Sequence, residues 1–394
     1  MVASSALFGR APAPARKAKR SANALPPRSP SGSDTNAGTL DAPFAIIKTA
    51  VELVVAGDTI YLHEGTHTPT HNIQITKSGT TNAPYTIAAY NGEKVVVDGE
   101  ELPHTPGELG DTIPRSDRGI FHIEADYWVF DGLEIIRGPY AIYADNSNHN
   151  TYLNLITRDN YETGTPFFAD VSASRRRSSR RPSKQGETSS NLVENLDSYS
   201  NHDPRKNGGS ADGLAVKQGF GEGNVIRGSR LWDNVDDGVD FIEFRSPVTV
   251  KTTYAWGNGF NRWGFELFEG DGNGFKLGGG DKDIMEPAAH VITNCIAFSN
   301  AAAGSNTRTG MQLDEPGYTV TLTSNIAVSN GIDTSLTDEA NASSNSWDSG
   351  SWSDASFASL DSSILTGARA ANGSIAALSS LLPANDAEIG AYYV

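Results

Sequence analysis

The chain has 394 residues, of which 38% are hydrophobic, so it is long enough to bury a substantial core. Its 31 Lys and Arg against 47 Asp and Glu give a net charge of −16, which argues against a protein that holds a polyanion by bulk electrostatics. No apolar run approaches the ~18 residues of a membrane span, and the single cysteine, Cys295, excludes an intrachain disulfide. The 40 Gly and 19 Pro indicate many turns and few long helices.

The N-terminal tract is rich in Ala, Pro, Ser and basic residues, and we expect residues 1–33 to be a disordered or processed segment. The apolar stretch that opens it is too short for a convincing signal peptide. After this segment, apolar residues recur at helical spacing until Gly57, which predicts one amphipathic helix before everything else. These apolar residues are Phe44, Ile47, Val51 and Val54.

Short runs typical of β-strands come next, and each is closed by Gly, Asn or Asp or followed soon after by one. They cover residues 59–62, 85–90, 94–99, 119–125 and 127–136. The pattern predicts an all-β fold with a single helix near its N-terminal end.

The middle of the chain repeats. Five segments align on a terminal asparagine at intervals of 33, 24, 42 and 30 residues, and a bulky side chain stands two positions earlier in each. The two columns are Asn201, Asn234, Asn258, Asn300 and Asn330, and Tyr199, Trp232, Trp256, Phe298 and Val328. Such a repeat predicts a parallel β-solenoid with insertions at one corner, in which the asparagines bond along the stack and the bulky side chains pack together. The alternative is a β-sandwich with regular turns.

A second group of strand-like segments aligns on Gly213, Gly238, Gly274 and Gly310. By strand alternation, the first and third residues after each glycine point inward. The outward column between them is Ala215, Asp240, Lys276 and Gln312. If the strands of Asp240 and Lys276 are neighbours ~4.8 Å apart, an acidic and a basic side chain lie side by side on one outer face.

Asp212, Asp236, Asp237 and Asp240 form a cluster of like charges that needs a positive partner. Oxygen-only ligands beside glycines suit Ca²⁺, which takes 6–8 oxygens in a flexible geometry. The spacing is not that of an EF-hand, so the calcium hypothesis depends on the stacking of coils. The alternative is that these are ordinary turn aspartates, which are common beside glycine.

Three segments, ADGLAVK, RLWDNVDDGVDFI and DGNGFKLGG, resemble polysaccharide lyase family 9 in their order and spacing. That family consists of calcium-dependent pectate lyases with a right-handed parallel β-helix. The resemblance extends roughly from Ser33 to Thr337 and includes an opening segment similar to the family's capping α-helix and first coil.

The resemblance implies that Asp212, Asp236, Asp237 and Asp240 bind Ca²⁺ and that Lys276 is the catalytic base. The implied reaction is β-elimination from polygalacturonate, which gives 4,5-unsaturated oligogalacturonides. Weaker candidates for holding substrate carboxylates are Lys217, Arg245 and Arg262. We also expect a secreted monomer that binds neither nucleic acid nor membranes.

Two alternative functions stay open. A β-helix glycoside hydrolase acting on pectin would use paired aspartates as acid and base without metal. A non-catalytic carbohydrate-binding solenoid would use the aspartates only to tie coils together.

The expected organisation has a β-helix domain over residues 34–337 and a tail over residues 338–394 that packs on the helix or caps its end. Within the domain, the Arg- and Ser-rich residues 165–188 interrupt the repeat, which predicts a disordered insertion or a gene-model artefact.

Overall fold

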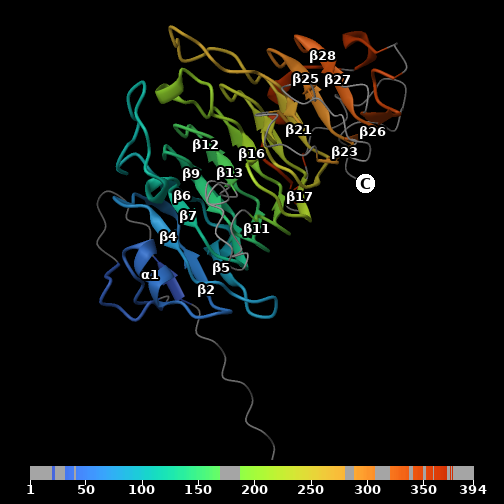
Figure 1. The fold of residues 1–394 in the computed structure, drawn as a ribbon. Helices are drawn as coiled ribbons and strands as arrows, with labels where there is room; N and C mark the ends of the chain where they lie inside the picture. The colour runs from blue at the N-terminus through green and yellow to red at the C-terminus, as the bar shows by residue number, and fades with distance from the viewer. Residues whose placement is uncertain are drawn as a thin grey trace, which may run out of the picture.

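The chain winds into a parallel β-helix made of three sheets (Figure 1). The computed structural model describes residues 20–22, 32–39, 41–168, 187–279, 288–306, 320–336, 340–348, 352–357, 359–370, 373 and 375. Within a sheet, each strand pairs in parallel with its equivalents in the preceding and following coils. The predicted solenoid is therefore confirmed, and the sandwich alternative is wrong.

Nine coils contribute one strand to each sheet. The first sheet contains β1 (Arg20–Ala22), β2 (Thr59–Leu62), β5 (Tyr85–Ala89), β8 (Trp128–Asp131), β11 (Thr151–Leu153), β14 (Leu192–Glu194), β17 (Asn224–Arg227), β20 (Val248–Lys251), β23 (Val291–Thr293), β26 (Thr321–Thr323) and β29 (Asn341–Ser343), and β1 and β29 belong to this sheet alone among the described residues. The site sheet, named for the residues described below, contains β4 (Ile73–Ile75), β7 (Phe121–Ile123), β10 (Ile142–Asp145), β13 (Thr165–Phe168), β16 (Leu214–Lys217), β19 (Val239–Asp240), β22 (Phe275–Lys276), β25 (Ala303–Asn306) and β28 (Ile332–Ser335). The third sheet contains β3 (Gly65–His67), β6 (Val95–Asp98), β9 (Leu133–Ile136), β12 (Ile156–Arg158), β15 (Asp197–Tyr199), β18 (Arg230–Trp232), β21 (Tyr254–Trp256), β24 (Ile296–Phe298) and β27 (Ile326–Val328).

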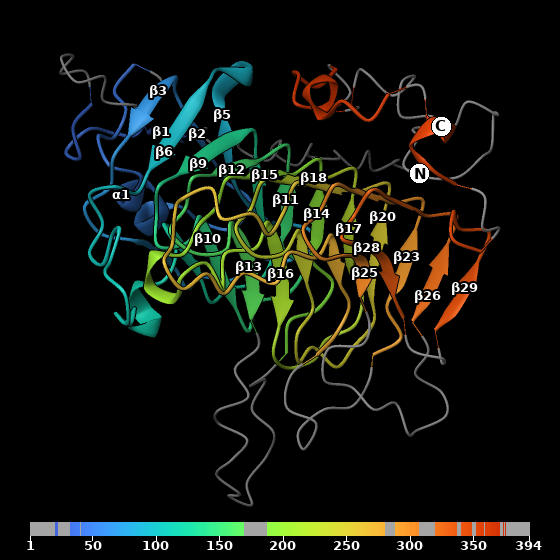
Figure 2. The same cartoon turned by 90° about the horizontal axis from the view of Figure 1, so that it is seen from above.

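The predicted helix is present as α1 (Ile47–Leu53), at the N-terminal end of the stacked coils (Figure 2). It buries Ile47, Ala50 and Val51 against β1, β2 and β4. Phe44 is buried but lies before the helix begins, so the apolar spacing predicted the helix one turn too long. Short 3₁₀ turns occur at Tyr90–Gly92, Arg115–Asp117, Pro204–Lys206, Asp354–Ser356 and Ser362–Leu365. None of the helices among the described residues has the length and apolar character needed to cross a membrane.

An asparagine ladder runs along the corner between the third sheet and the site sheet. The side-chain amide of each residue donates to the amide oxygen of the next, over 2.8 Å for Asn201 to Asn234 and 3.0 Å for Asn234 to Asn258. The full ladder is Asn160, Asn201, Asn234, Asn258, Asn300 and Asn330. The predicted column is confirmed and begins one coil earlier than predicted.

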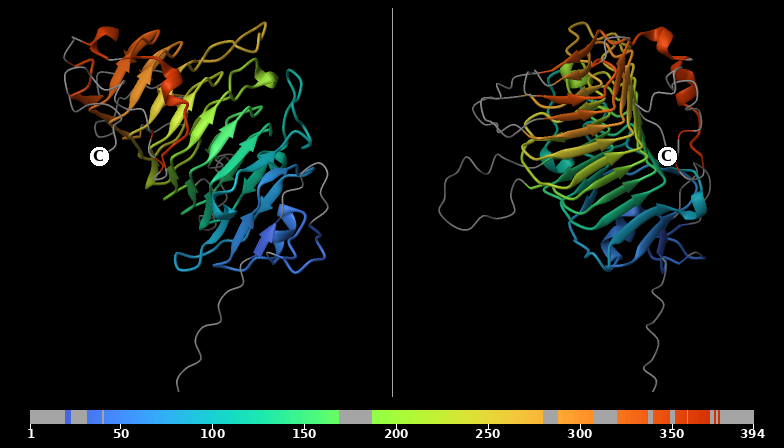
Figure 3. Two further views of the ribbon diagram at one scale, coloured as in Figure 1. Left: turned by 180° about the vertical axis from the view of Figure 1, so that it is seen from behind. Right: turned by 90° about the vertical axis from the view of Figure 1, so that its right-hand side faces the viewer.

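The aromatic column stacks on the outer side of the third sheet and is covered by the C-terminal segment, drawn in red alongside the coils in Figure 3. Ring centroids are 4.1 Å apart for Tyr199 and Trp232 and 5.0 Å apart for Trp232 and Trp256, in nearly parallel planes. The predicted stacking is confirmed. Phe357, Leu365 and Ile375 of the C-terminal segment pack on this column.

Two segments expected to be disordered contain strands. Arg20–Ala22 form β1, which pairs with β2, so the expectation was wrong for these residues. Thr165–Phe168 form β13, which bridges β10 and β16, and Glu187 forms a bridge with Phe220. The predicted insertion was therefore wrong at both of its ends, and residues 169–186 lie outside the described residues.

Candidate active site

The inward and outward positions of the site sheet follow the predicted alternation. Leu214, Val239 and Phe275 are in register and buried in the core. Ala215 pairs with Asp240, and Asp240 pairs with Lys276, so the predicted acid and base are neighbours on one outer face. The segment that contains Gly310 and Gln312 lies outside the described residues. The strand next to β22 is instead β25, in which Gly304 is in register with Gly274.

Close backbone contact explains the glycine column. A Cβ atom added to Gly213 would lie 2.9 Å from the carbonyl oxygen of Gly238. One added to Gly238 would lie 2.6 Å from the carbonyl oxygen of Gly274. Both distances are shorter than real Cβ contacts allow. The glycines therefore let successive coils approach closely at this corner, and the residues before them lie directly above one another.

Gly164 is in register with Gly213, and the residues that precede these glycines form a column that we call the acidic corner: Thr163, Asp212, Asp237 and Asn273. Thr163 Oγ1 donates to Asp212 Oδ2 over 2.9 Å, and the Asp237 backbone N–H donates to Asp212 Oδ1 over 3.4 Å. Both the backbone N–H and the side-chain amide of Asn273 donate to Asp237 Oδ1, over 2.6 and 2.8 Å. The two carboxylates are thus held in fixed orientations by neighbouring coils.

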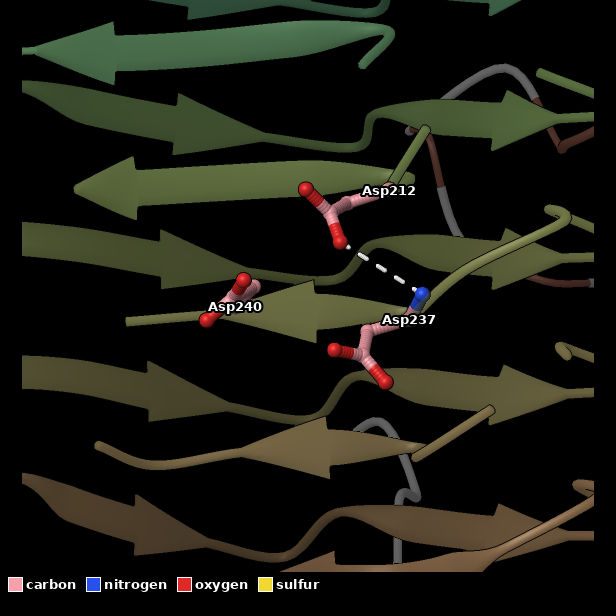
Figure 4. Close-up of side chains that lie close together, drawn as sticks. All are labelled: Asp212, Asp237 and Asp240. Atoms are coloured by element: carbon pink, nitrogen blue, oxygen red, sulfur yellow. Dashed lines mark hydrogen bonds between the residues drawn. The ribbon is translucent and has the colours of Figure 1, made fainter. Parts of the chain in front are cut away.

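Asp240 lies on β19 and faces the same space as the acidic corner, as Figure 4 shows. Its Oδ1 accepts a hydrogen bond of 2.8 Å from the Ile242 backbone N–H. One carboxylate oxygen from each of Asp212, Asp237 and Asp240 lies within 4.8 Å of the other two. Asp236 belongs to an adjoining group with Asp237 and Asp271, within the same limit. The structure thus brings the four predicted aspartates into two overlapping groups.

The Lys276 ammonium lies among these carboxylates. Its Nζ is 3.2 Å from Asp237 Oδ2, 3.6 Å from Asp240 Oδ2 and 2.6 Å from Asp271 Oδ2. The Asp271 side chain is half exposed, whereas the Lys276 side chain is buried, so Asp271 marks the side of Lys276 that faces solvent. The predicted base therefore lies beside the predicted metal ligands.

Burial and neighbouring charges raise the pKa of some of these groups and lower that of others. Burial raises the pKa of Asp236 well above its usual range, and it raises the pKa of Asp237 to about 7 against the opposing charge of Lys276. Burial acts in the same sense on Asp240, but the ammonium groups of Lys217 and Lys276 outweigh it and lower the pKa of that carboxyl. Burial disfavours the charged form of Lys276, yet the charges of Asp237, Asp240 and Asp236 outweigh it and raise the lysine pKa.

The donor set suits a divalent cation. All the candidate ligand atoms are carboxylate oxygens, which hard cations such as Ca²⁺ prefer. Asp237 Oδ2 is buried, lies 3.2 Å from Lys276 Nζ, and has no hydrogen bond within the described part of the chain. A buried carboxylate oxygen without a hydrogen bond is costly, and a metal ion would satisfy it.

The three weaker substrate-binding candidates have protein partners. Lys217 lies between two of the aspartates, as described below. Arg262 forms an ion pair of 2.8 Å with Asp233 and lies over the ring of Phe260. Arg245 lies over the ring of Phe220. Their role in holding substrate stays a prediction.

Asp271, Thr163 and Asn273 were missed in the sequence. Asp271 stands five positions before Lys276, and Asp212 stands five positions before Lys217, with an ion pair in both cases. This repeated spacing was the available signal. Thr163 carries no comparable signal, because its place in the column depends on the pairing of β13 with β16.

Comparisons with known proteins give a consistent result. The family profile described as "Pel9A-like, right handed beta helix region" matches residues 28–346. A protein of Emericella nidulans named pectate lyase PEL9 is 50% identical, over 92% of this chain and 93% of its own length. A protein of Dickeya chrysanthemi named pectate lyase L is 31% identical, over 88% of this chain and 80% of its own length.

Solved structures agree with the fold. The structure titled "Crystal structure of pectate lyase Pel9A" matches with a TM-score of 0.74 and 30% identity, over 95% of this chain and 91% of that one. A structure titled "Rhamnogalacturonan lyase" has a TM-score of 0.72 at 22% identity, over 95% of this chain and 100% of that one, which shows a shared fold. The chain therefore belongs to the Pel9A-like right-handed β-helix family, which is polysaccharide lyase family 9.

Proposed function

We propose that this protein is a pectate lyase that cleaves polygalacturonate by calcium-assisted β-elimination, with Lys276 as the base. The observation that carries the proposal is the placement of Lys276 Nζ, 3.2 and 3.6 Å from carboxylate oxygens of Asp237 and Asp240, which belong to the candidate calcium site. Relatives named pectate lyases, at up to 50% identity among those described above, support the substrate. We further propose that the protein acts as a secreted monomer on homogalacturonan.

Asp212, Asp237 and Asp240 would hold the ion, with Asp236 adjoining them. When bound, Ca²⁺ would neutralise the uronate carboxylate next to the reacting carbon and offset the charge of the aspartates around Lys276. The corner supplies rigid ligands because Thr163 and Asn273 fix the carboxylates of Asp212 and Asp237 through hydrogen bonds.

Lys276 performs the proton transfer. Its neutral amine takes the proton from C5 of the uronate, and the electrons of that C–H bond form the double bond between C4 and C5. The bond from C4 to the glycosidic oxygen breaks, and the leaving sugar acquires a proton from solvent. Asp271 accepts a hydrogen bond of 2.6 Å from Nζ and orients the amine toward the exposed side of the site.

The test is the formation of unsaturated product from polygalacturonate, with Ca²⁺ and with a chelator. A C4–C5 double bond conjugated to the carboxylate absorbs in the ultraviolet, so product is measured directly by absorbance. We expect absorbance to rise with Ca²⁺ and to stop on addition of chelator.

Other outcomes would identify the alternative functions. New reducing ends without ultraviolet absorbance, unaffected by chelator, would indicate a glycoside hydrolase that uses the aspartates as acid and base. Binding of polygalacturonate without any cleavage would indicate a carbohydrate-binding solenoid.

A further inference from the structure

Lys217 is the second ammonium group of the site and is enclosed between two of the candidate calcium ligands. Its Nζ lies 2.8 Å from Asp212 Oδ2 and 2.7 Å from Asp240 Oδ2. Only 13% of its side chain is exposed, and the two carboxylates are essentially buried. Lys217 therefore joins a ligand from the corner before β16 to a ligand on β19.

The strand geometry leaves room for this arrangement. Ala215 and Lys217 are on the same face of β16, and Ala215 pairs with Asp240. Because the Ala215 side chain is a single methyl group, the lysine side chain can run back along its strand toward Asp212.

This position differs from that of Lys276. Lys276 is itself buried, but one of its three acidic partners, Asp271, is half exposed and marks the side of the site where a substrate would enter. Both ion pairs of Lys217 are instead with buried carboxylates that belong to the candidate calcium group. A group in this place acts on the ligands rather than on substrate.

We propose that Lys217 is a built-in counter-charge of the calcium site. It holds Asp212 and Asp240 in their binding positions when no ion is bound, and it weakens the binding of calcium by placing a positive charge beside the ion. This inference depends on the calcium site of the proposed function. It gives Lys217 the role of a positioning residue and not that of a substrate contact or a second base.

The physical reason is electrostatic. Two like charges a few ångströms apart in a partly buried site repel strongly, whereas each alone is attracted to the same carboxylates. Removing the lysine charge therefore has two opposite consequences. The ion binds more tightly, and the protein without ion becomes less stable because two buried carboxylates lose their partner.

The experiment measures Ca²⁺ binding by isothermal titration calorimetry and thermal unfolding in chelator, on the full chain. For Lys217→Met we expect the Kd for Ca²⁺ to fall by about tenfold or more and the Tm in chelator to fall by at least ~2 °C. Lys217→Gln serves as a second variant if the methionine protein does not fold, with the same expectation. Lys217→Arg, which keeps the charge, and Lys251→Met, which removes an exposed lysine on β20, should bind Ca²⁺ as the unaltered protein does.

The outcomes separate this inference from the proposed function. If the unaltered protein and Lys217→Met bind Ca²⁺ with equal affinity, or the variant binds more weakly, the counter-charge role is wrong and the calcium site stands. If the unaltered protein binds no Ca²⁺ at all, the calcium assignment itself is wrong, and the inference fails with it.

Discussion

The asparagine ladder and the acidic corner are two columns of stacked side chains in the connection between the third sheet and the site sheet. The ladder is uncharged, whereas the acidic corner contains two carboxylates. An asparagine amide both donates and accepts, so each rung satisfies the next, as in the 2.8 Å bond from Asn201 to Asn234. A carboxylate only accepts, so the carboxylates of Asp212 and Asp237 cannot bond to each other and take donors from Thr163, Asn273 and the backbone.

The comparison shows how a column of side chains that only stabilises the fold differs from one that can bind a metal ion. A stacked column of amides satisfies itself, whereas the carboxylates of the acidic corner need donors or positive charge from outside the column. Lys217 and Lys276 meet part of that demand, and carboxylate oxygens of Asp212, Asp237 and Asp240 that lie within 4.8 Å of one another suit a calcium ion.

The largest effect is expected for Lys276→Arg. Arginine keeps the positive charge beside Asp237 and Asp240, but its guanidinium does not release a proton under ordinary conditions. We expect kcat to fall ~10²- to 10⁴-fold with substrate binding much less affected. Product formation and binding of polygalacturonate are measured separately in the presence of Ca²⁺. A variant that keeps more than about a tenth of the kcat, against that range, would show that Lys276 is not the base.

Asp237→Asn replaces one carboxylate of the acidic corner by an amide, the group that forms the asparagine ladder. Loss of residues that only support a metal ligand typically costs 10- to 100-fold in affinity, so loss of a ligand should cost more than ~10²-fold in Ca²⁺ affinity and in activity. The far-ultraviolet circular dichroism should remain that of a β protein. Unchanged calcium binding in this variant would remove Asp237 from the ligand set.

The two columns should also respond differently to pH. Burial raises the folded-state pKa of Asp237 to about 7, above the usual range of an aspartate, so the folded protein binds this proton more tightly than the unfolded chain does. The resulting stability is present at pH 4 and lost as the pH rises through 7, on the order of 3 kcal/mol. We therefore expect the unaltered protein in chelator to lose that much stability between pH 4 and pH 7 relative to Asp237→Asn.

The free energy of unfolding must be compared between the two proteins, because buried histidines change the stability of each in the opposite direction with pH. Burial lowers the pKa of His67 to about 4 and that of His290 to about 3, so their contribution to stability is lost as the pH falls below 6.5. The same histidines are present in both proteins and cancel, whereas the measured difference includes Asp236, whose pKa the charge of Asp237 helps to raise. A difference that does not change with pH would contradict the raised pKa of Asp237.

Asn234→Ala breaks the ladder and leaves the acidic corner intact. Asn201 loses its acceptor and Asn258 loses a donor, both in the buried core of the corner. We expect a loss of about 2 kcal/mol in the free energy of unfolding by urea, with kcat close to that of the unaltered protein. The exposed Asn82→Ala is the matched control. A large loss of kcat with little loss of stability would mean that the ladder has a direct role in catalysis.

Thr163→Val should give the smallest effect. It removes the hydroxyl that donates to Asp212 Oδ2 over 2.9 Å but keeps the shape of the side chain. Because Thr163 supports a ligand without being one, we expect Ca²⁺ affinity to fall about tenfold. Calorimetric titration measures the change, and an unaltered affinity would show that the hydroxyl does not position Asp212.

Much of this fold was predictable because the repeat appears in the sequence. A ladder needs the same residue type at each rung, so the asparagine and aromatic columns could be aligned without a structure, and strand alternation then placed Asp240 beside Lys276. The inward residues Leu214, Val239 and Phe275 were predictable for the same reason.

The remaining features of the site and of its sheet depended on contacts between coils of unequal length, which the sequence pattern does not give. The alternation rule ends at a glycine corner, so the orientation of Asp212 and Asp237 was not predictable, nor was the contribution of Thr163, which precedes a strand next to an Arg-rich segment. The pairing of β25 with β22 was missed because Gly304 and Gly310 both follow at plausible distances. The enclosure of Lys217 by two aspartates from different coils required the structure.

The most direct test of the central claim is a crystal structure of the protein grown with Ca²⁺, with the ion located by anomalous scattering. We predict an ion at the acidic corner, with oxygens of Asp212, Asp237 and Asp240 at about 2.3–2.6 Å and with Lys276 outside the coordination shell. No ion at this corner at saturating Ca²⁺, with Lys276 still paired to Asp237, would contradict the claim that this corner is the calcium site.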